Sequence, residues 1–256
     1  MRSTTKLSKQ TLVVGLAHPD DELGVAGSIL AQRARGDRVV IVWLTRGEQT
    51  EAFGPLPTRE VGKRREEQGH RAAKILDAEA LFLDFPDTAI VADREAAAQI
   101  ARLLCKLEPD GLITWGEGWV RGTRHPDHQA CGRIFRDAIT LARIAKVVDP
   151  LTPHRKPVPV FTIRDVHSSV PAVGVDVTPY RSAVAELAEH YFHGVGFGHP
   201  DWLERRLRET GARWGFDYAE ELDAWETIPG PVQSLLPAQP LEGVPHPERS
   251  ERRPDR

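Results

Sequence analysis

The chain has 256 residues, of which 40% are hydrophobic and 28% charged, and its formal net charge is -3. This composition offers no positive field for nucleic acid or an anionic membrane, and no apolar run approaches the ~20 residues that span a bilayer. Residues 1–10 lack an apolar signal core, and two cysteines, Cys105 and Cys131, form no Cys-x-x-Cys pair, so we expect a cytoplasmic protein without disulfides.

Strand-like and helix-like patterns alternate along most of the chain. Apolar, β-branched runs predict strands at residues 11–17, 38–45, 80–85, 110–114 and 158–166, with a sixth at residues 172–177. Apolar residues at helical spacing predict helices at residues 23–35, 59–76, 94–107, 126–147, 181–193 and 201–210. The second helix should bury a stripe of Val61, Ala72, Ala73 and Leu76. Such alternation is typical of a doubly wound, Rossmann-like α/β fold with a mostly parallel sheet and helices on both faces.

The end of the chain has a different composition. Seven of the 20 prolines fall in residues 229–256, among balanced charges and little periodic apolar pattern. Such a segment has few residues that can bury a core. We therefore predict one domain over residues 10–228 and a disordered, proline-rich tail over residues 229–256.

Two loops of this fold carry histidines and carboxylates. The loop after the first strand reads His18-Pro-Asp-Asp-Glu22, and the loop after the fourth strand reads His125-Pro-Asp-His128. In the common strand order 3-2-1-4-5, the first and fourth strands are neighbours, and ligands bind at their carboxyl ends. The sequence therefore predicts an active site where these two loops meet.

Each loop has a simpler explanation as a helix start, because proline is favoured at the first helical position and carboxylates complement the helix dipole. Two copies on converging loops favour a shared site. A catalytic zinc ion takes three protein ligands and leaves a fourth position open. His18 and Asp21 can supply two ligands and His128 the third, which leaves Asp20 and His125 as a base and an oxyanion donor. Spacing alone leaves this division of roles open.

These motifs resemble the LmbE/PIG-L family of zinc-dependent N-acetylglucosaminyl deacetylases. The resemblance rests on Ala17-His-Pro-Asp-Asp-Glu22 and His125-Pro-Asp-His128, and extends through Thr45-Arg-Gly-Glu48, Arg65-Glu-Glu-Gln68 and Phe82-Leu-Asp-Phe-Pro-Asp87. It covers residues 10–195. Gln68 and Asp77 depart from the family pattern, which has glutamate and glycine at these positions.

The resemblance implies a hydrolase that removes an N-acyl group, above all acetyl, from a small amino sugar or its conjugate. It implies that one zinc ion is held by His18, Asp21 and His128. It also implies that Asp20 is the general base and His125 the general acid. Substrate binding is implied for Glu48, Arg65 and Asp87. A homo-oligomer is compatible with the sequence.

Two rival interpretations remain. His18-x-Asp20 with a distal histidine also matches the two-histidine, one-carboxylate triad of non-haem iron oxygenases. The strong helical periodicity argues against the all-β scaffolds that we associate with that spacing. The other rival is a non-catalytic module that binds a metal or ligand on the same fold. The presence of every expected ligand and catalytic residue favours the enzyme.

Overall fold

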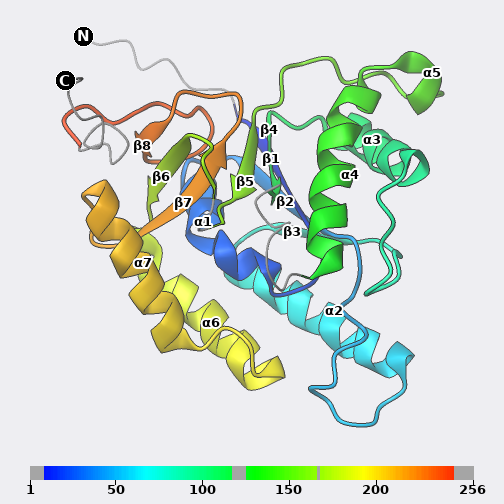
Figure 1. Cartoon of the computed structure of the whole chain (residues 1–256), viewed down its shortest axis with the longest axis horizontal. Coiled ribbons are helices and arrows are strands. Elements are labelled where there is room, and N and C mark those ends of the chain that lie inside the picture. Colours follow the sequence, from blue (N-terminus) through cyan, green and yellow to red (C-terminus); the bar gives the residue numbers. More distant parts are fainter. Residues whose placement is uncertain (1–8, 117–124, 166–167, 245–256) are drawn as a thin grey trace.

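Eight strands form one sheet in the order β3-β2-β1-β4-β5-β7-β6-β8 (Figure 1). The computed structural model describes residues 9–116, 125–165 and 168–244. The five strands from β3 to β5 pair in parallel, whereas β7 runs antiparallel to both β5 and β6. This order confirms the expected doubly wound fold and makes the first and fourth strands neighbours.

The elements alternate as the sequence predicts. The strands are β1 (Thr11–Leu16), β2 (Arg38–Trp43), β3 (Glu79–Phe82), β4 (Gly111–Trp115), β5 (Val160–Ile163), β6 (Ala172–Asp176), β7 (Ala219–Ala224) and β8 (Gly230–Val232). The α-helices are α1 (Ala26–Ala34), α2 (Thr58–Ile75), α3 (Arg94–Leu107), α4 (Pro126–Ala142), α5 (Ala145–Val148), α6 (Arg181–Val195) and α7 (Pro200–Trp214). The 3-10 turns among the described residues are η1 (Asp21–Gly24) and η3 (Thr178–Tyr180). Within the described ranges, no helix is long and apolar enough to cross a membrane.

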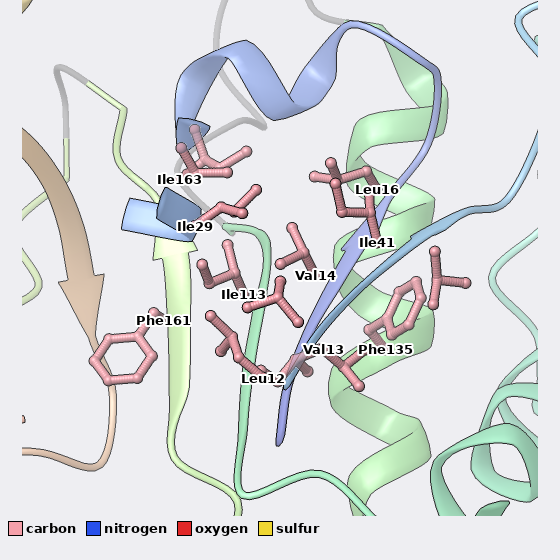
Figure 2. Packing of buried hydrophobic residues seen from close by; sticks show 14 of the residues in the cluster. Leu12, Val13, Val14, Leu16, Ile29, Ile41, Ile113, Phe135, Phe161 and Ile163 are labelled. Atoms are coloured by element: carbon pink, nitrogen blue, oxygen red, sulfur yellow. The ribbon is translucent and has the colours of Figure 1, made fainter. Parts of the chain in front are cut away.

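The central strands are apolar along almost their whole length, as is typical of strands that helices cover on both faces of the sheet. Figure 1 shows α3 and α4 on one side of the sheet, with α6 and α7 on the other. Figure 2 shows side chains of β1, β4 and β5 packed together with Phe135 of α4 and Ile29 of α1. Gly15 in β1 permits the close approach of α4, since a Cβ there would lie 2.5 Å from the Phe135 ring. The predicted buried stripe of α2 is confirmed.

The helix predicted at residues 126–147 is two helices. α4 ends at Ala142, and α5 begins at Ala145. The carbonyl oxygen of Ala142 accepts a hydrogen bond of 3.0 Å from the backbone N–H of His154. This bond holds the segment that leads to β5 against the end of α4. The α4 carbonyl is then paired outside the helix, and the helix ends before Arg143. The helix predicted at residues 23–35 likewise starts later, because η1 occupies its first residues.

The prediction of a disordered tail from residue 229 is wrong for its first part. β8 pairs in parallel with β6, and Val232, Leu235 and Leu236 are buried. Gln32 of α1 donates to the Leu236 carbonyl (2.8 Å) and accepts from its N–H (3.0 Å). The proline-rich segment therefore completes the sheet edge and covers α1. The last part of the predicted tail, residues 245–256, lies outside the described residues.

Candidate active site

The loop after β1 fixes the side chain of Asp21 through one of its two oxygens. Asp21 Oδ2 accepts hydrogen bonds from the backbone N–H groups of Ala17 (2.9 Å) and His18 (3.0 Å), and from Trp115 Nε1 (3.0 Å). The other oxygen, Oδ1, lies 3.1 Å from His128 Nε2 and 3.9 Å from His18 Nδ1. Burial alone would raise the pKa of Asp21, but His128 and His18 outweigh it and hold this pKa well below its ordinary value. Asp21 is therefore a carboxylate that faces two imidazoles.

The start of α4 presents two more imidazoles. His125 is the N-cap of α4, where its Nδ1 accepts from the backbone N–H of Asp127 at 3.3 Å, and Pro126 follows at the first helical position. His128 stacks on Trp115 at a ring-centroid distance of 3.8 Å and an interplanar angle of 7°. Burial, His18 and His128 together lower the pKa of His125. The His125-Pro-Asp-His128 motif thus begins a helix, as proline at the first helical position favours. It also supplies side chains to the site.

The two loops converge as predicted. One nitrogen each from His18, His125 and His128 lies within 4.8 Å of the others, which is close enough to hold a metal ion. A second such group consists of His18, Asp87, His125 and Asp127. The predicted ligand set shares His18 and His128 with the first group. Its third member is Asp21, whose carboxylate lies next to both histidines.

His18 is surrounded by carboxylates. Its Nε2 lies 3.2 Å from Asp87 Oδ1 and 3.2 Å from Asp127 Oδ2, while Asp21 lies on the Nδ1 side. Burial lowers the pKa of His18, but hydrogen bonds from its ring to Asp127, Asp21 and Asp87 outweigh burial and raise the pKa to about 12. A buried pocket of this kind requires a positive charge. The histidines and aspartates are ligands that zinc takes in proteins, so the donor set fits a divalent metal ion.

Asp20 forms an ion pair with Arg65 at the edge of the imidazole cluster. The buried Arg65 guanidinium donates to Asp20 Oδ2 (2.6 Å) and Gln68 Oε1 (2.8 Å), and also to the Pro19 carbonyl. Burial raises the pKa of Asp20 to about 6, although Arg65 opposes this shift. Asp20 has a φ of 117°, a left-handed conformation that is rare for a residue other than glycine. Such strain is found at functional sites.

The three residues implied in substrate binding have different positions. Arg65 and Asp87 line the cavity that contains His18. Glu48 is absent from that lining and accepts hydrogen bonds from the backbone N–H groups of Asp87 (3.0 Å) and Arg46 (3.2 Å). Asp87 Oδ2 in turn accepts from the N–H of Gln49 at 2.8 Å. Glu48 therefore holds the Asp87 loop in place.

The cavity has a volume of about 690 Å³ and opens above the carboxyl ends of β1 and β4. All five residues assigned to metal binding or catalysis line it. The rest of the wall includes parts of α2 and α7, the loops after β2 and β3, the end of β5, and the turn between α6 and α7.

Sequence reasoning missed two buried carboxylates that shape the site. Asp127 accepts from the backbone N–H of Thr88 at 2.7 Å and thereby ties the loop after β3 to α4. Glu22 accepts from Trp43 Nε1 (3.1 Å), from the Asp20 N–H (3.0 Å) and from the Tyr191 hydroxyl. Both carboxylates lie inside the two histidine-containing motifs, so the sequence shows where they are. It does not show their hydrogen-bond partners, because these partners lie on distant segments.

The fold and these donors define a doubly wound α/β protein with a His/Asp site suited to a metal ion at the carboxyl edge of its sheet. Residues 12–139 match the PIG-L family, described as GlcNAc-PI de-N-acetylase. This chain belongs to that family.

Similar proteins support membership in this family. Diacetylchitobiose deacetylase of Thermococcus kodakarensis is 31% identical over 144 residues, which cover 54% of this chain and 54% of that protein. The chain thus matches about half the length of that relative. The probable N-acetyl-alpha-D-glucosaminyl L-malate deacetylase 2 of Bacillus anthracis is 31% identical over 221 residues, which cover 78% of this chain and 94% of that protein. The fold is similar to N,N'-diacetylchitobiose deacetylase from Pyrococcus horikoshii, with a TM-score of 0.76, 19% identity and 84% of each chain covered.

Proposed function

We propose that this protein is a metal-dependent hydrolase that removes an N-acyl group, above all acetyl, from a small amino sugar or amino-sugar conjugate. The convergence of His18, Asp21 and His128 with Asp20 on one cavity carries this proposal. Membership in the PIG-L family and relatives named as deacetylases of N-acetyl amino sugars support it.

The proposed cofactor is one zinc ion per chain, held by His18, Asp21 and His128. Two histidines and a carboxylate, with one position left open, are typical of a catalytic zinc site. Trp115 supports this arrangement, because it donates to Asp21 and stacks on His128. When bound, zinc polarises the amide carbonyl and lowers the pKa of water to about 7.

The side chains around the metal have separate tasks in this proposal. Asp20 takes the proton from the attacking water, and Arg65 holds Asp20 in place. His125 donates a hydrogen bond to the oxyanion that develops from the carbonyl. The carbon–nitrogen bond of the amide then breaks, and His125 delivers a proton to the leaving amine. The products are a carboxylate, acetate in the simplest case, and a free amine.

We propose that Asp87 and Arg65 bind sugar hydroxyls; their place in the cavity lining next to the proposed metal ligands supports this. We assign Glu48 an indirect part through Asp87. The iron-oxygenase interpretation required His18 and Asp20 to act as ligands together. Asp20 is instead paired with the Arg65 guanidinium, and the family and fold favour the hydrolase over both rivals.

The test is an assay of free amine released from N-acetylglucosamine, diacetylchitobiose and N-acetylglucosaminyl conjugates. We expect turnover of at least one substrate, loss of turnover after chelation, and recovery on addition of zinc. Oxygen uptake that depends on iron would support the oxygenase instead. Binding of these sugars without any amine release would support the non-catalytic module.

We further propose that residues 10–244 form one catalytic domain, since one sheet and one large core include strands from both ends of this range. A cytoplasmic location is our expectation, and it is supported by free thiols at both Cys105 and Cys131.

A further inference from the structure

The cavity has two chemically different halves. The inner half carries the imidazoles and carboxylates of the proposed reaction. The outer half is formed by the turn between α6 and α7, the start of α7, and the end of β5. Its side chains are mostly apolar, among them Ile163, Val195, Phe197, Trp202 and Leu203. An N-acetyl amino sugar is polar and has no need of a large apolar wall. The outer half of the cavity is therefore available to a different part of the substrate.

The outer half is packed directly on η1, in the connection that follows β1. Gly198, at a φ of +74°, approaches Leu23 so closely that a Cβ there would lie 2.6 Å from Leu23 Cδ1. Leu23 belongs to η1, which begins at Asp21. Phe197 is 53% exposed and Trp202 is 46% exposed, so aromatic surface remains uncovered at the cavity. A group attached to a sugar in the inner half would therefore reach this surface.

Arg206 adds a positive charge to this apolar wall. It lines the cavity, and its guanidinium carbon lies 5.6 Å from the centroid of the Trp202 ring. Among the described residues, we find no carboxylate that forms an ion pair with Arg206. Two other arginines of α7 do have such partners, since Arg208 pairs with Glu204 (2.9 Å) and Arg213 with Glu221 (2.8 Å).

The carboxylates near Arg206 are already used elsewhere. Glu220 accepts three hydrogen bonds of 2.7 Å, from the N–H groups of Gly27 and Ser28 and from the Ser28 hydroxyl. Glu221 pairs with Arg213 and, at 3.3 Å, with Arg164. Burial of a guanidinium is costly unless a partner compensates it. Arg206 is therefore a cation whose partner can come from the cavity.

We propose that the outer half of the cavity binds the part of the substrate beyond the acylated sugar, and that this part combines an apolar face with an anionic group. Trp202 and Phe197 cover the apolar face. Arg206 binds a carboxylate or phosphate, because a planar guanidinium can donate two parallel hydrogen bonds to either group. This inference rests on the proposed N-deacylase function and specifies the class of its substrate.

The test compares four glycosides of N-acetylglucosamine whose aglycones are methyl, phenyl, 4-carboxyphenyl and 4-phosphooxyphenyl. The measured quantity is kcat/KM for amine release by the zinc-loaded wild type, Arg206→Met, Arg206→Lys and Arg205→Met. Arg205 is the exposed neighbour of Arg206 on α7, is absent from the cavity lining and serves as the matched control.

We expect the kcat/KM of the wild type to be higher for the phenyl glycoside than for the methyl glycoside. For at least one anionic aryl glycoside it should exceed the phenyl value by about tenfold, the usual effect of one charge-assisted hydrogen bond. The better of the two anionic aglycones identifies the anion. Arg206→Met should reduce the ratio of anionic to neutral aryl substrate to about one, Arg206→Lys should keep part of it, and Arg205→Met should keep all of it.

The possible failures are distinguishable. Absence of amine release from all four glycosides would count against the deacylase function itself. Turnover of methyl and phenyl glycosides without any gain from the anion, or a gain that persists in Arg206→Met, would overturn only the inference about the outer half. Thermal unfolding of each variant shows whether the comparison is made on folded protein.

Discussion

The guanidinium of Arg65 lies 2.6 Å from the carboxylate of Asp20, and both groups are wholly or largely removed from solvent. Arg65 is held there by two further acceptors, Gln68 and the Pro19 carbonyl. This pair therefore fixes both the position and the protonation of the proposed base.

Replacing Arg65 with methionine should raise the pKa of Asp20, because Arg65 favours the charged carboxylate while burial favours the neutral acid. Asp20 must be ionised to act as a base, so the acidic limb of the kcat/KM profile should move to higher pH. We expect turnover at pH 6 to fall more than turnover at pH 8. Profiles of wild type and variant with the same acidic limb would contradict the role of this pair.

A second prediction concerns Trp115 as a support for the proposed metal ligands Asp21 and His128. Trp115→Phe retains an aromatic ring against His128 but removes the Nε1 donor to Asp21. Loss of a partner of this kind lowers metal affinity by roughly 10- to 100-fold. Titration with a competing chelator measures the effect. An unchanged zinc affinity would show that the bond does not orient Asp21.

A third prediction locates the metal. The described residues offer two neighbouring groups of donors, one around His128 and one around Asp87 and Asp127. Anomalous diffraction at the zinc edge should place the ion within bonding distance of His18, Asp21 and His128. A peak between Asp87 and Asp127 would reject the proposed ligand set while keeping a metal site in the cavity.

A fourth prediction concerns stability and Glu220, which lies buried at the start of α1. Burial raises the pKa of Glu220 from 4.5 to about 7. The folded state therefore binds more protons than the unfolded state between these values, and this contribution to stability falls as pH rises from 4.5 to 7. Glu220→Gln should remove up to about 3 kcal/mol of that pH dependence.

Urea unfolding of wild type and Glu220→Gln at pH 5 and pH 7.5 measures this difference. The exposed Glu226→Gln variant is the control, and we expect it to keep the wild-type slope. If the Glu220 variant also keeps that slope, the buried carboxyl does not titrate between folded and unfolded states as we expect.

Much of the fold could be predicted because its central strands are continuous apolar runs. β1 and β2 read TLVVGL and RVVIVW, and parallel strands that are buried on both faces require such sequences. β7 reads AEELDA and was missed, because residues of low strand propensity dominate it. Its place between β5 and β6 depends on pairing with distant strands. The same holds for β8, whose prolines suggested a tail.

The inner half of the site was predictable for a similar reason. His18 and His125 stand in short motifs within the connections that follow the neighbouring strands β1 and β4, so topology brings them together. Arg206 has no such signal, since it is one of several arginines on a polar helix. Only the packing of α7 against the sheet places it at the cavity.

The most direct measurement of the central claim is the rate of amine release by zinc-loaded Asp20→Asn protein. Asparagine preserves the size of the side chain but cannot take a proton from water. Since general base catalysis contributes roughly 10²- to 10⁴-fold, we predict a loss of that order in kcat with zinc content equal to that of the wild type. Near-normal turnover by the zinc-loaded variant would contradict the account.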